Sequence, residues 1–241
     1  MERSESGQPI YRHNDPKKPF ELAIGDSARI EDISKHIVRH VGPIETVYHE
    51  LISNLVHIDI HIVAPSPQRN CYTLVTSGMS DRPMNVPKEV QAPTQVELMM
   101  CLPATWKLDE PSLKDPANYW PIHMLKAVAR MPHEYDTWVG PGHTIPNGDP
   151  AEPFVDSTAL CCAVVLPPIT VPEAFWQLTI DANTTIHFYS LWFLHRDELN
   201  LKLRKGIEAL MPGFERNQVT ELLDPARPTS IRKKRWWFPF G

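Results

Sequence analysis

The stretch Val56–Val63, VHIDIHIV, alternates polar residues with branched apolar ones, and this pattern decides the fold. Side chains of a β-strand point alternately to its two faces, so His57, Asp59 and His61 share one face. The three isoleucines of the stretch point to the other face. The pattern therefore predicts a strand with one apolar face in a core and a row of ligand-capable side chains opposite.

Further strands are expected on both sides of this stretch. Runs rich in β-branched and aromatic residues predict extended segments at 46–52, 56–63, 71–76, 94–102, 157–166 and 184–194. The last two are the most apolar of the set, which is typical of buried strands.

Three segments have helical periodicity. Their apolar residues recur every three or four positions, which predicts helices at about 28–41, 119–131 and 195–210. Gly42–Pro43 is the stop signal of the first helix, and Pro212–Gly213 that of the third.

The middle helix contains one proline and is followed by another. Pro121 fits only in a first turn, where its missing N–H costs nothing, and Pro132 is expected to close the helix. Residues 132–156 are then predicted to form a loop, with YDTWV at 135–139 as its only extended piece.

The order of these elements predicts the fold class. Helix, strands, helix, strands and helix follow one another without a regular βαβ repeat, which indicates an α+β domain. We expect a single domain with a central mixed β-sheet flanked by about three helices. The predicted parts are a polar N-terminal arm at 1–27, this domain at 28–225, and a basic and aromatic tail at 226–241.

Composition excludes several classes of protein. The 241 residues carry a formal net charge of −5, whereas general nucleic-acid binders are strongly basic. No apolar run approaches the roughly 20 residues of a membrane helix, and the polar N-terminus lacks the apolar core of a secretory signal. A cytoplasmic protein that binds neither nucleic acid nor membrane is expected. The 25 prolines cluster between apolar runs and indicate stiff connections, which are good recognition surfaces.

The four cysteines are expected to be reduced thiols in apolar surroundings. None stands at the two-residue spacing of zinc or redox motifs. Cys161 and Cys162 are adjacent on a predicted strand and should face opposite sides, which makes joint metal binding awkward.

The C-terminal segment RKKRWWFPF, 232–240, combines four basic residues with four aromatic ones. An exposed cluster of this kind promotes aggregation, so the composition favours a tail that folds back onto the body. The alternatives are a partner-binding arm and an anchor to a membrane or a nucleic acid.

Candidate chemistry centres on the polar strand face. His57, Asp59 and His61 have suitable ligand types for zinc or iron, but no further compact ligand cluster is evident, and we expect no metal or other cofactor. A small hydrolase could use the same face with Ser77 or Ser80. Capping of a loop that turns at a glycine explains the two serines better.

One carboxylate is unusual in its position. Glu97 lies in an otherwise apolar predicted strand and must be paired or have its proton affinity altered. Arg130 is the structural partner we expect.

Four blocks of the sequence resemble the suppressor of fused domain. They are residues 56–87, 96–108, 119–148 and 186–210, and YTLVTSGMSDRPM at 72–84 is the most specific element. The resemblance covers roughly residues 30 to 225. Animal members place an aspartate before the histidine that matches His143, and Gly142 stands there in this chain.

The resemblance implies a non-enzymatic protein-binding module. Single-domain bacterial members are regarded as immunity proteins, which neutralise a cognate toxin by binding it in the producing cell. A partner protein, plausibly such a toxin, is therefore expected. The candidate partner-binding residues are His57, Asp59, His61, Ser77, Ser80, Asp81, Arg82, Trp138, His143 and Asn147.

Overall fold

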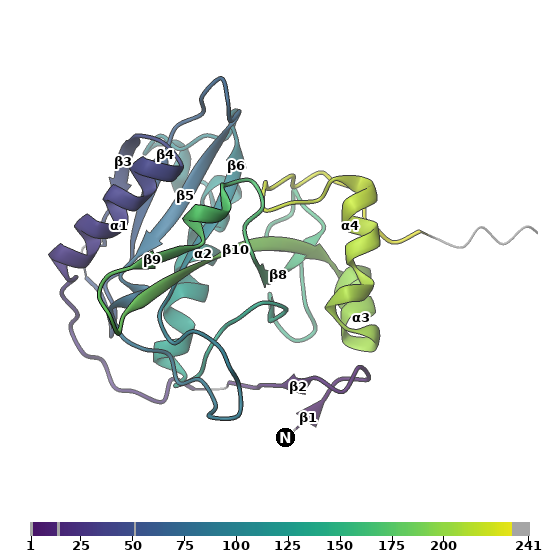
Figure 1. Ribbon diagram of the computed structural model, residues 1–241. Coiled ribbons are helices and arrows are strands. Elements are labelled where there is room, and N and C mark those ends of the chain that lie inside the picture. Colours follow the sequence, from purple (N-terminus) through teal and green to yellow (C-terminus); the bar gives the residue numbers. More distant parts are fainter. Residues whose placement is uncertain (1, 14, 51, 233–241) are drawn as a thin grey trace, which may run out of the picture.

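The computed structural model describes residues 2–13, 15–50 and 52–232 (Figure 1). Its strands are β1 (Glu2–Arg3), β2 (Pro9–Ile10), β3 (Ile44–Tyr48), β4 (Asp59–Val63), β5 (Cys71–Ser77), β6 (Val96–Pro103), β7 (Thr144–Pro146), β8 (Leu160–Leu166), β9 (Gln177–Thr179) and β10 (Thr185–His195). Its α-helices are α1 (Ser27–His40), α2 (Pro116–Glu134), α3 (Arg196–Lys205) and α4 (Met211–Asn217). Single 3₁₀ turns are η1 (Met79–Asp81), η2 (Ser112–Lys114), η3 (Glu173–Phe175) and η4 (Ile207–Ala209).

One sheet runs through the body in the order β3-β4-β5-β6-β10-β8-β7, and β9 pairs with the start of β10. The β6–β10 pair is parallel, while the other neighbouring strands of this sheet are antiparallel. The predicted single α+β domain with a central mixed sheet is confirmed. The described residues contain four α-helices, where about three were expected.

The register confirms the alternation predicted from VHIDIHIV. Asp59 lies opposite Ser77 of β5, and His61 lies between Val47 of β3 and Val75 of β5. The three isoleucines of the stretch are buried in one apolar cluster with α2.

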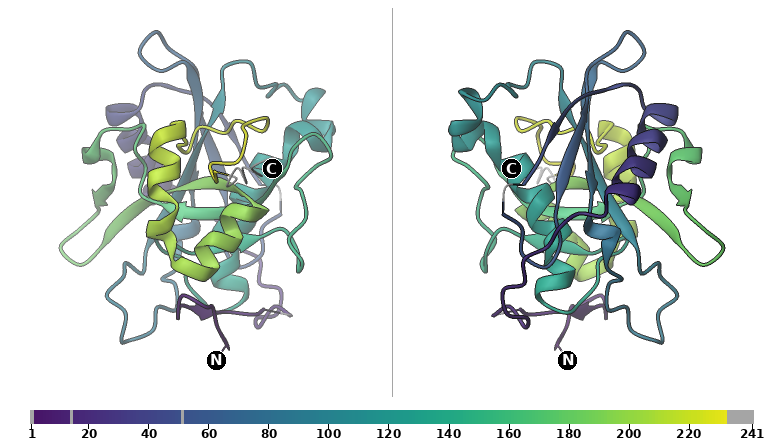
Figure 2. Two further views of the ribbon diagram at one scale, coloured as in Figure 1. Left: turned by 90° about the vertical axis from the view of Figure 1, so that its right-hand side faces the viewer. Right: turned by 90° about the vertical axis from the view of Figure 1, so that its left-hand side faces the viewer.

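The two faces of the sheet are covered by different helices. α2 packs on the isoleucine face, through Leu125 and Val128. α1 packs on the opposite face, where Ile33 and Ile37 contact a cluster that includes Phe188 of β10. Figure 2 shows α1 and α2 on opposite sides of the sheet. α3 and α4 cover the rest of the α1 face over β8 and the end of β10.

The middle helix begins earlier than predicted, so Pro121 is not in its first turn. Asp115 is the N-cap, its carboxylate accepts from the amide of Ala117 at 2.9 Å, and Pro116 is the first helical residue. Pro121 and Pro132 both lie inside the helix. The N-cap at Asp115–Pro116 and the burial of one face stabilise α2 by more than is lost through the hydrogen bonds that these prolines cannot donate.

The third predicted helix is divided into two. Gly206, with a φ of 86°, ends α3, because it adopts a backbone conformation that other residues rarely adopt. The chain resumes in η4 and α4. Pro212–Gly213 therefore lies in the first turns of α4 and does not end a helix.

Residues 132–156 are more ordered than predicted. α2 continues to Glu134, the piece 135–139 forms no strand, and the short strand β7 pairs with β8. β7 and β9 have three residues each, and such short strands depend on pairing with a neighbour rather than on their own sequence pattern.

The N-terminal arm lies against the body. The amide of Ser6 donates to the carbonyl of Leu203 in α3, and the amide of Lys17 donates to the carbonyl of Glu134 at the end of α2. Further along, Leu22 forms a bridge with Asn54. The predicted division at residues 27 and 225 remains a prediction.

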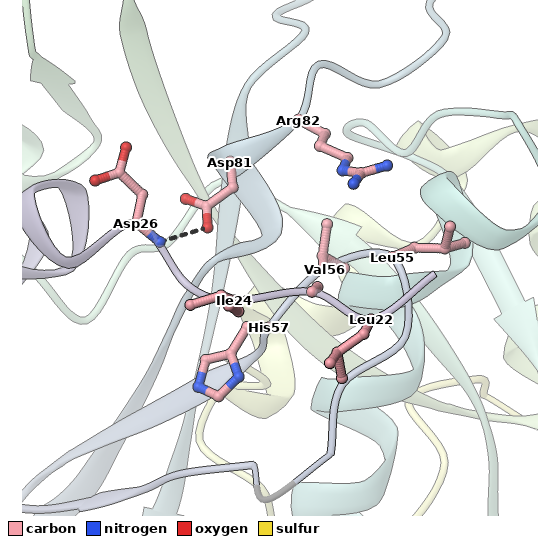
Figure 3. A pocket seen from close by; sticks show the side chains of 9 residues that line it. Leu22, Ile24, Asp26, Leu55, Val56, His57, Asp81 and Arg82 are labelled. Carbon is pink, nitrogen blue, oxygen red and sulfur yellow. Dashed lines mark hydrogen bonds between the residues drawn. The ribbon is translucent and has the colours of Figure 1, made fainter. Parts of the chain in front are cut away.

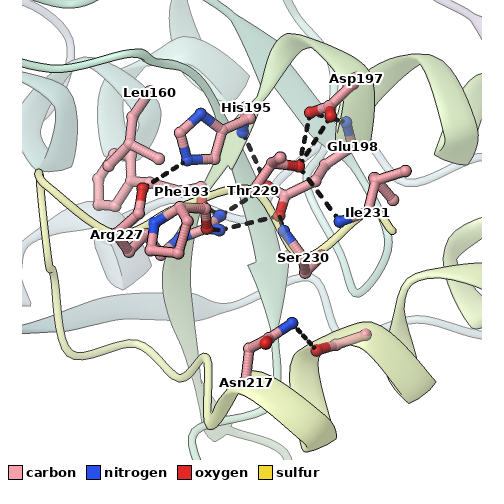
Figure 4. Close-up of polar contacts among 12 residues, drawn as sticks. Leu160, Phe193, His195, Asp197, Glu198, Asn217, Arg227, Thr229, Ser230 and Ile231 are labelled. Atoms are coloured by element: carbon pink, nitrogen blue, oxygen red, sulfur yellow. Dashed lines mark hydrogen bonds and ion pairs between the residues drawn. The ribbon is translucent and has the colours of Figure 1, made fainter. Parts of the chain in front are cut away.

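The chain returns to the start of α3 after residue 225. Arg227 donates to both carboxylate oxygens of Glu198, and the amide of Ser230 donates to the same carboxylate at 2.7 Å (Figure 4). Of the predicted basic and aromatic tail, residues 233–241 lie outside the described residues.

All four cysteines are buried free thiols, as expected. Cys161 and Cys162 do not face opposite sides as predicted, because an irregularity in the β8–β10 register at His195 interrupts the alternation. Both thiols lie in the apolar cluster under α3 and α4.

Within the described ranges, no helix is long and apolar enough to cross a bilayer.

Candidate functional site

A hollow of about 280 Å³ lies where the arm passes the start of β4 and the η1 turn (Figure 3). We call it the His57 hollow. Its lining includes the side chains of Leu22, Ile24, Leu55, His57, Asp81 and Arg82. They come from three segments that are far apart in the sequence.

Backbone hydrogen bonds hold two of these segments together. The amide of Leu55 donates to the carbonyl of Glu21 at 2.8 Å, and the amide of Ala23 donates to the carbonyl of Ser53 at 3.1 Å. The walls therefore have a defined shape, although they lie outside the regular strands.

Large apolar side chains are exposed around this hollow. Leu22 is 62% and Ile24 89% exposed, and both line the hollow. A grouping of this kind, as opposed to single scattered residues, is typical of an interaction site.

Glycine at position 78 allows the loop after β5 to pass under the start of β4. Gly78 has a φ of 98°, and a Cβ atom there would lie 1.8 Å from the carbonyl oxygen of His57. The turn that follows carries Ser80, Asp81 and Arg82. A glycine is therefore required for the turn to form one wall of the hollow.

Ser80 is a structural residue. It is fully buried, and its amide and hydroxyl both donate to the carboxylate of Glu97, at 2.9 and 2.7 Å. The hydroxyl of Thr76 donates to the same carboxylate at 2.6 Å. Burial raises the pKa of Glu97 to about 7, and these hydrogen bonds oppose that rise. The predicted pairing of Glu97 with Arg130 is wrong, because Arg130 pairs with Glu50 at 2.6 Å.

Asp81 and Arg82 face the hollow. Asp81 accepts from the amide of Asp26, the N-cap of α1, at 3.2 Å, and burial raises the pKa of the Asp81 carboxyl. Arg82 pairs with Glu21 of the arm. Both side chains place charge at the edge of the apolar surface.

His61 and Ser77 form a hydrogen-bonded pair that resembles part of a hydrolytic site. Nε2 of His61 lies 2.9 Å from Oγ of Ser77. Both residues are at most 1% exposed, and no described residue is a hydrogen-bond partner for Nδ1 of His61. Burial lowers the pKa of His61 to about 4. A nucleophilic pair needs substrate access and a third group that orients the base, and this pair shows neither among the described residues.

Asp59 links two histidines. The carboxylate, which is 2% exposed, lies 2.9 Å from Nδ1 of His49 and 3.0 Å from Nε2 of His57. It also accepts from the amide of Glu50. His49 has no local signal in the sequence, because only the register of β3 against β4 places it beside Asp59.

The remaining candidate residues lie at the other edge of the sheet, beside β7. The rings of Trp138 and His143 are 4.2 Å apart, and burial, with a smaller effect of Lys202, lowers the pKa of His143 to about 4. Asn147 donates to the carbonyls of Glu152 and Pro153, both at 3.0 Å. The strand order separates these residues from the His57 hollow.

A second hollow, of about 470 Å³, lies along α2. Lys126 and Arg130, one helical turn apart, face Glu50 there. Burial raises the pKa of Glu50, but hydrogen bonding and charge from Arg130 outweigh burial and leave this pKa below its usual value. The four-residue spacing of the two cations is the only signal for this contact in the sequence.

Comparisons with known structures agree with this architecture. A protein described as a suppressor of fused homologue from Neisseria gonorrhoeae FA 1090 has a TM-score of 0.63 at 14% identity, over 86% of this chain and 100% of the other. The crystal structure of a Sufu–Fu complex contains a chain with a TM-score of 0.53 at 16% identity, over 81% of this chain and 86% of that one. At these identities the likeness concerns the fold.

A comparison with curated proteins found no match. The model of one protein family, described as suppressor of fused protein, matches residues 54–228. This range contains the four blocks that carried the predicted resemblance, including the turn at 77–82. The chain belongs to the suppressor of fused protein family.

Proposed function

We propose that this chain is a non-enzymatic protein-binding module whose partner docks on the His57 hollow. The observation that carries this proposal is the exposure of Leu22 and Ile24 around a concavity with fixed walls. Apolar anchors at the centre of a patch, with polar groups at its rim, are the usual arrangement of a protein interface.

The size of the hollow supports a protein partner. At about 280 Å³ it lies below the roughly 300–1,000 Å³ typical of small-molecule sites. It can accept one or two side chains from a larger docked surface, which is how the strongest contacts of protein interfaces are commonly made.

The seven predicted partner-binding residues near the His57 hollow divide into two groups. His57, Asp81 and Arg82 line the hollow and are proposed as contacts. The buried candidates Asp59, His61, Ser77 and Ser80 act indirectly, because they hold the strand ends and the turn in position. Such preorganisation lowers the entropic cost of binding.

The family supports a binding role as well, since one chain of similar fold was crystallised in the Sufu–Fu complex. We further propose that the partner is a toxin and that this chain neutralises it in the cytoplasm of the producing cell. The support is the resemblance to single-domain bacterial members and the net charge of −5, which suits a protein partner rather than nucleic acid.

Affinity capture from the producing cells tests this function. The wild-type chain and two variants, Ile24→Glu and Ile169→Glu, serve as baits. Ile169 is also exposed, at 56%, but is not among the residues that line the hollow, so it is a matched control. We expect one stoichiometric partner that is retained by Ile169→Glu and reduced at least tenfold by Ile24→Glu.

The same experiment can contradict the proposal. Repeated failure to recover a stoichiometric partner, or equal recovery with both variants, would reject the His57 hollow as the docking site. For the toxin, the captured protein expressed alone should arrest growth, and co-expression of this chain should restore it. A captured protein that is harmless when expressed would reject the immunity role and leave the binding role standing.

A further inference from the structure

Three potential ligand atoms converge at the edge of the sheet, beside the His57 hollow. Nδ1 of His49, Nε2 of His57 and a carboxylate oxygen of Asp59 all lie within 4.8 Å of one another. His49 follows the edge strand β3 and its side chain is 64% exposed, while that of Asp59 is 2% exposed. The group is thus buried on one side and open to solvent on the other.

The hydrogen bonds around His57 indicate that its Nε2 atom, which faces Asp59, carries no proton. The hydroxyl of Ser53 lies 2.9 Å from the carboxylate of Glu50 and 2.8 Å from Nδ1 of His57. A carboxylate that pairs with Arg130 can only accept, so the single hydroxyl proton of Ser53 goes to Glu50. Nδ1 of His57 must then carry the proton and donate it to Ser53.

This assignment leaves a lone pair on Nε2 of His57. That atom lies 3.0 Å from Oδ1 of Asp59, and two lone pairs at this distance repel. A cation between them removes the repulsion. The cation is either a second proton on His57 or a metal ion shared with His49.

The surroundings of His57 are those of a metal ligand. A histidine that binds metal usually donates its other ring N–H to an oriented acceptor, which fixes the ring and the tautomer. Ser53 supplies that acceptor, and Glu50 in turn fixes Ser53, since Glu50 also accepts from Arg130 and from the amide of Ile58 at 3.1 Å.

We propose that His49, His57 and Asp59 bind one divalent transition-metal ion, with Ser53 and Glu50 positioning His57. Two imidazole nitrogens and one carboxylate oxygen suit zinc and its neighbours in the first transition row. In a tetrahedral zinc site with bonds of about 2.0–2.1 Å, ligand atoms are roughly 3.3 Å apart. Nδ1 of His49 lies 2.9 Å from one carboxylate oxygen of Asp59 and Nε2 of His57 lies 3.0 Å from the other. One ligand atom from each of the three residues lies within 4.8 Å of the others, so small side-chain movements would bring them to the separation of such a site.

The site differs from the row of three residues that the strand pattern suggests. His61 is directed to Ser77, and its place is taken by His49, which directly follows the neighbouring strand β3. A bound ion would fasten the end of β3 to the start of β4. It would thereby hold His57, which lines the His57 hollow, in position.

Metal titration of the full-length protein tests the site. Protein purified without a polyhistidine tag and stripped with a chelator is titrated with Co²⁺, followed by visible absorption, and with Zn²⁺, followed by calorimetry. We expect one ion per chain and the absorption of four- or five-coordinate Co²⁺. His49→Ala and His57→Ala should each weaken binding at least about a hundredfold, and Ser53→Ala about 10–100-fold.

His123→Ala is the matched control. His123 is an exposed histidine of α2, like His49 in accessibility, and its loss should leave the affinity unchanged. His49 lies at the surface, so His49→Ala is expected to fold even if replacement of the buried Asp59 prevents folding. Absence of stoichiometric binding, or binding that survives both His49→Ala and His57→Ala, would overturn the proposal. A doubly protonated His57 in NMR spectra of a protein that binds no metal would do the same.

Discussion

Glu97 accepts two hydrogen bonds from a single residue, Ser80, through the backbone amide and the side-chain hydroxyl. Glu97 lies on β6 and Ser80 on the η1 turn, so this contact ties the turn to the sheet. The neighbours of Ser80 in the turn, Asp81 and Arg82, line the His57 hollow. The buried carboxylate thus fixes one wall of the proposed docking site.

Removing the hydroxyl of Ser80 should destabilise the protein. Ser80→Ala leaves one oxygen of a fully buried carboxylate without a side-chain donor, so we expect a loss of about 1–3 kcal/mol in the free energy of unfolding, measured in urea. Ser34→Ala is the control, because the Ser34 hydroxyl bonds only within its own helix, to the carbonyl of Ile30. That control should change stability by less than about 0.5 kcal/mol.

Glu97 should also make stability depend on pH. Its pKa is about 7 in the folded chain, against 4.5 for the unfolded group, so the folded state retains a proton between these values. Its contribution to stability is full below pH 4.5 and is lost as the pH rises to about 7.

Glu97→Gln removes this titration. The stability of the variant relative to wild type should therefore increase from pH 4.5 to about 7, by on the order of 3 kcal/mol, and then stay constant. Urea unfolding of both proteins across this range measures the difference. A difference that does not vary with pH would show that Glu97 is not the titrating group.

Two glycines with a positive φ should respond differently to alanine. Gly78 and Gly206 have φ values of 98° and 86°, but a Cβ atom would clash with His57 only at position 78 and would meet open space at position 206. Gly206→Ala should cost about 1–3 kcal/mol for the backbone conformation alone, because its ψ of 169° lies in a region that residues other than glycine rarely adopt. Gly78→Ala should cost at least about 2 kcal/mol more. Equal losses in thermal or urea unfolding would contradict the close approach of the two chain segments.

Two of the arginine–carboxylate pairs should differ in how much they contribute to stability. Arg227 and Glu198 are 10% and 0% exposed, so Arg227→Ala leaves a buried charge unpaired and should cost about 3–5 kcal/mol. Arg82 and Glu21 are 35% and 57% exposed, and Arg82→Ala should change the free energy of unfolding by less than about 1 kcal/mol. Chemical denaturation of both variants checks the contrast, and a loss below about 1 kcal/mol for Arg227→Ala would be inconsistent with it.

Local signals predicted most of the fold. The helical periodicity of α1 and the alternation in β4 and β5 depend on neighbouring residues, and these elements lie where the sequence places them. The bounds predicted for α2 and α3 are wrong, at the prolines of α2 and at Gly206 after α3. The packing of a helix decides whether a proline is tolerated inside it.

The candidate site was predictable only in part. Alternation in β4 placed His57 and Asp59 together, but His49 joins them through the register of two strands, which no local pattern specifies. Leu22 and Ile24 reach the hollow through bonds between the arm and residues 53–55, a contact between segments about 30 positions apart. Likewise, the pairing of Arg130 with Glu50 depends on the tertiary fold.

Site-specific photo-crosslinking in the producing cells tests the central claim most directly. A photoreactive amino acid at position 24 lies in the proposed docking surface, and one at position 169 is also exposed but does not line the hollow. We predict that position 24 crosslinks to a single protein in near-stoichiometric yield and that position 169 does not. Crosslinking from position 169 but not from position 24, or from neither, would contradict the account.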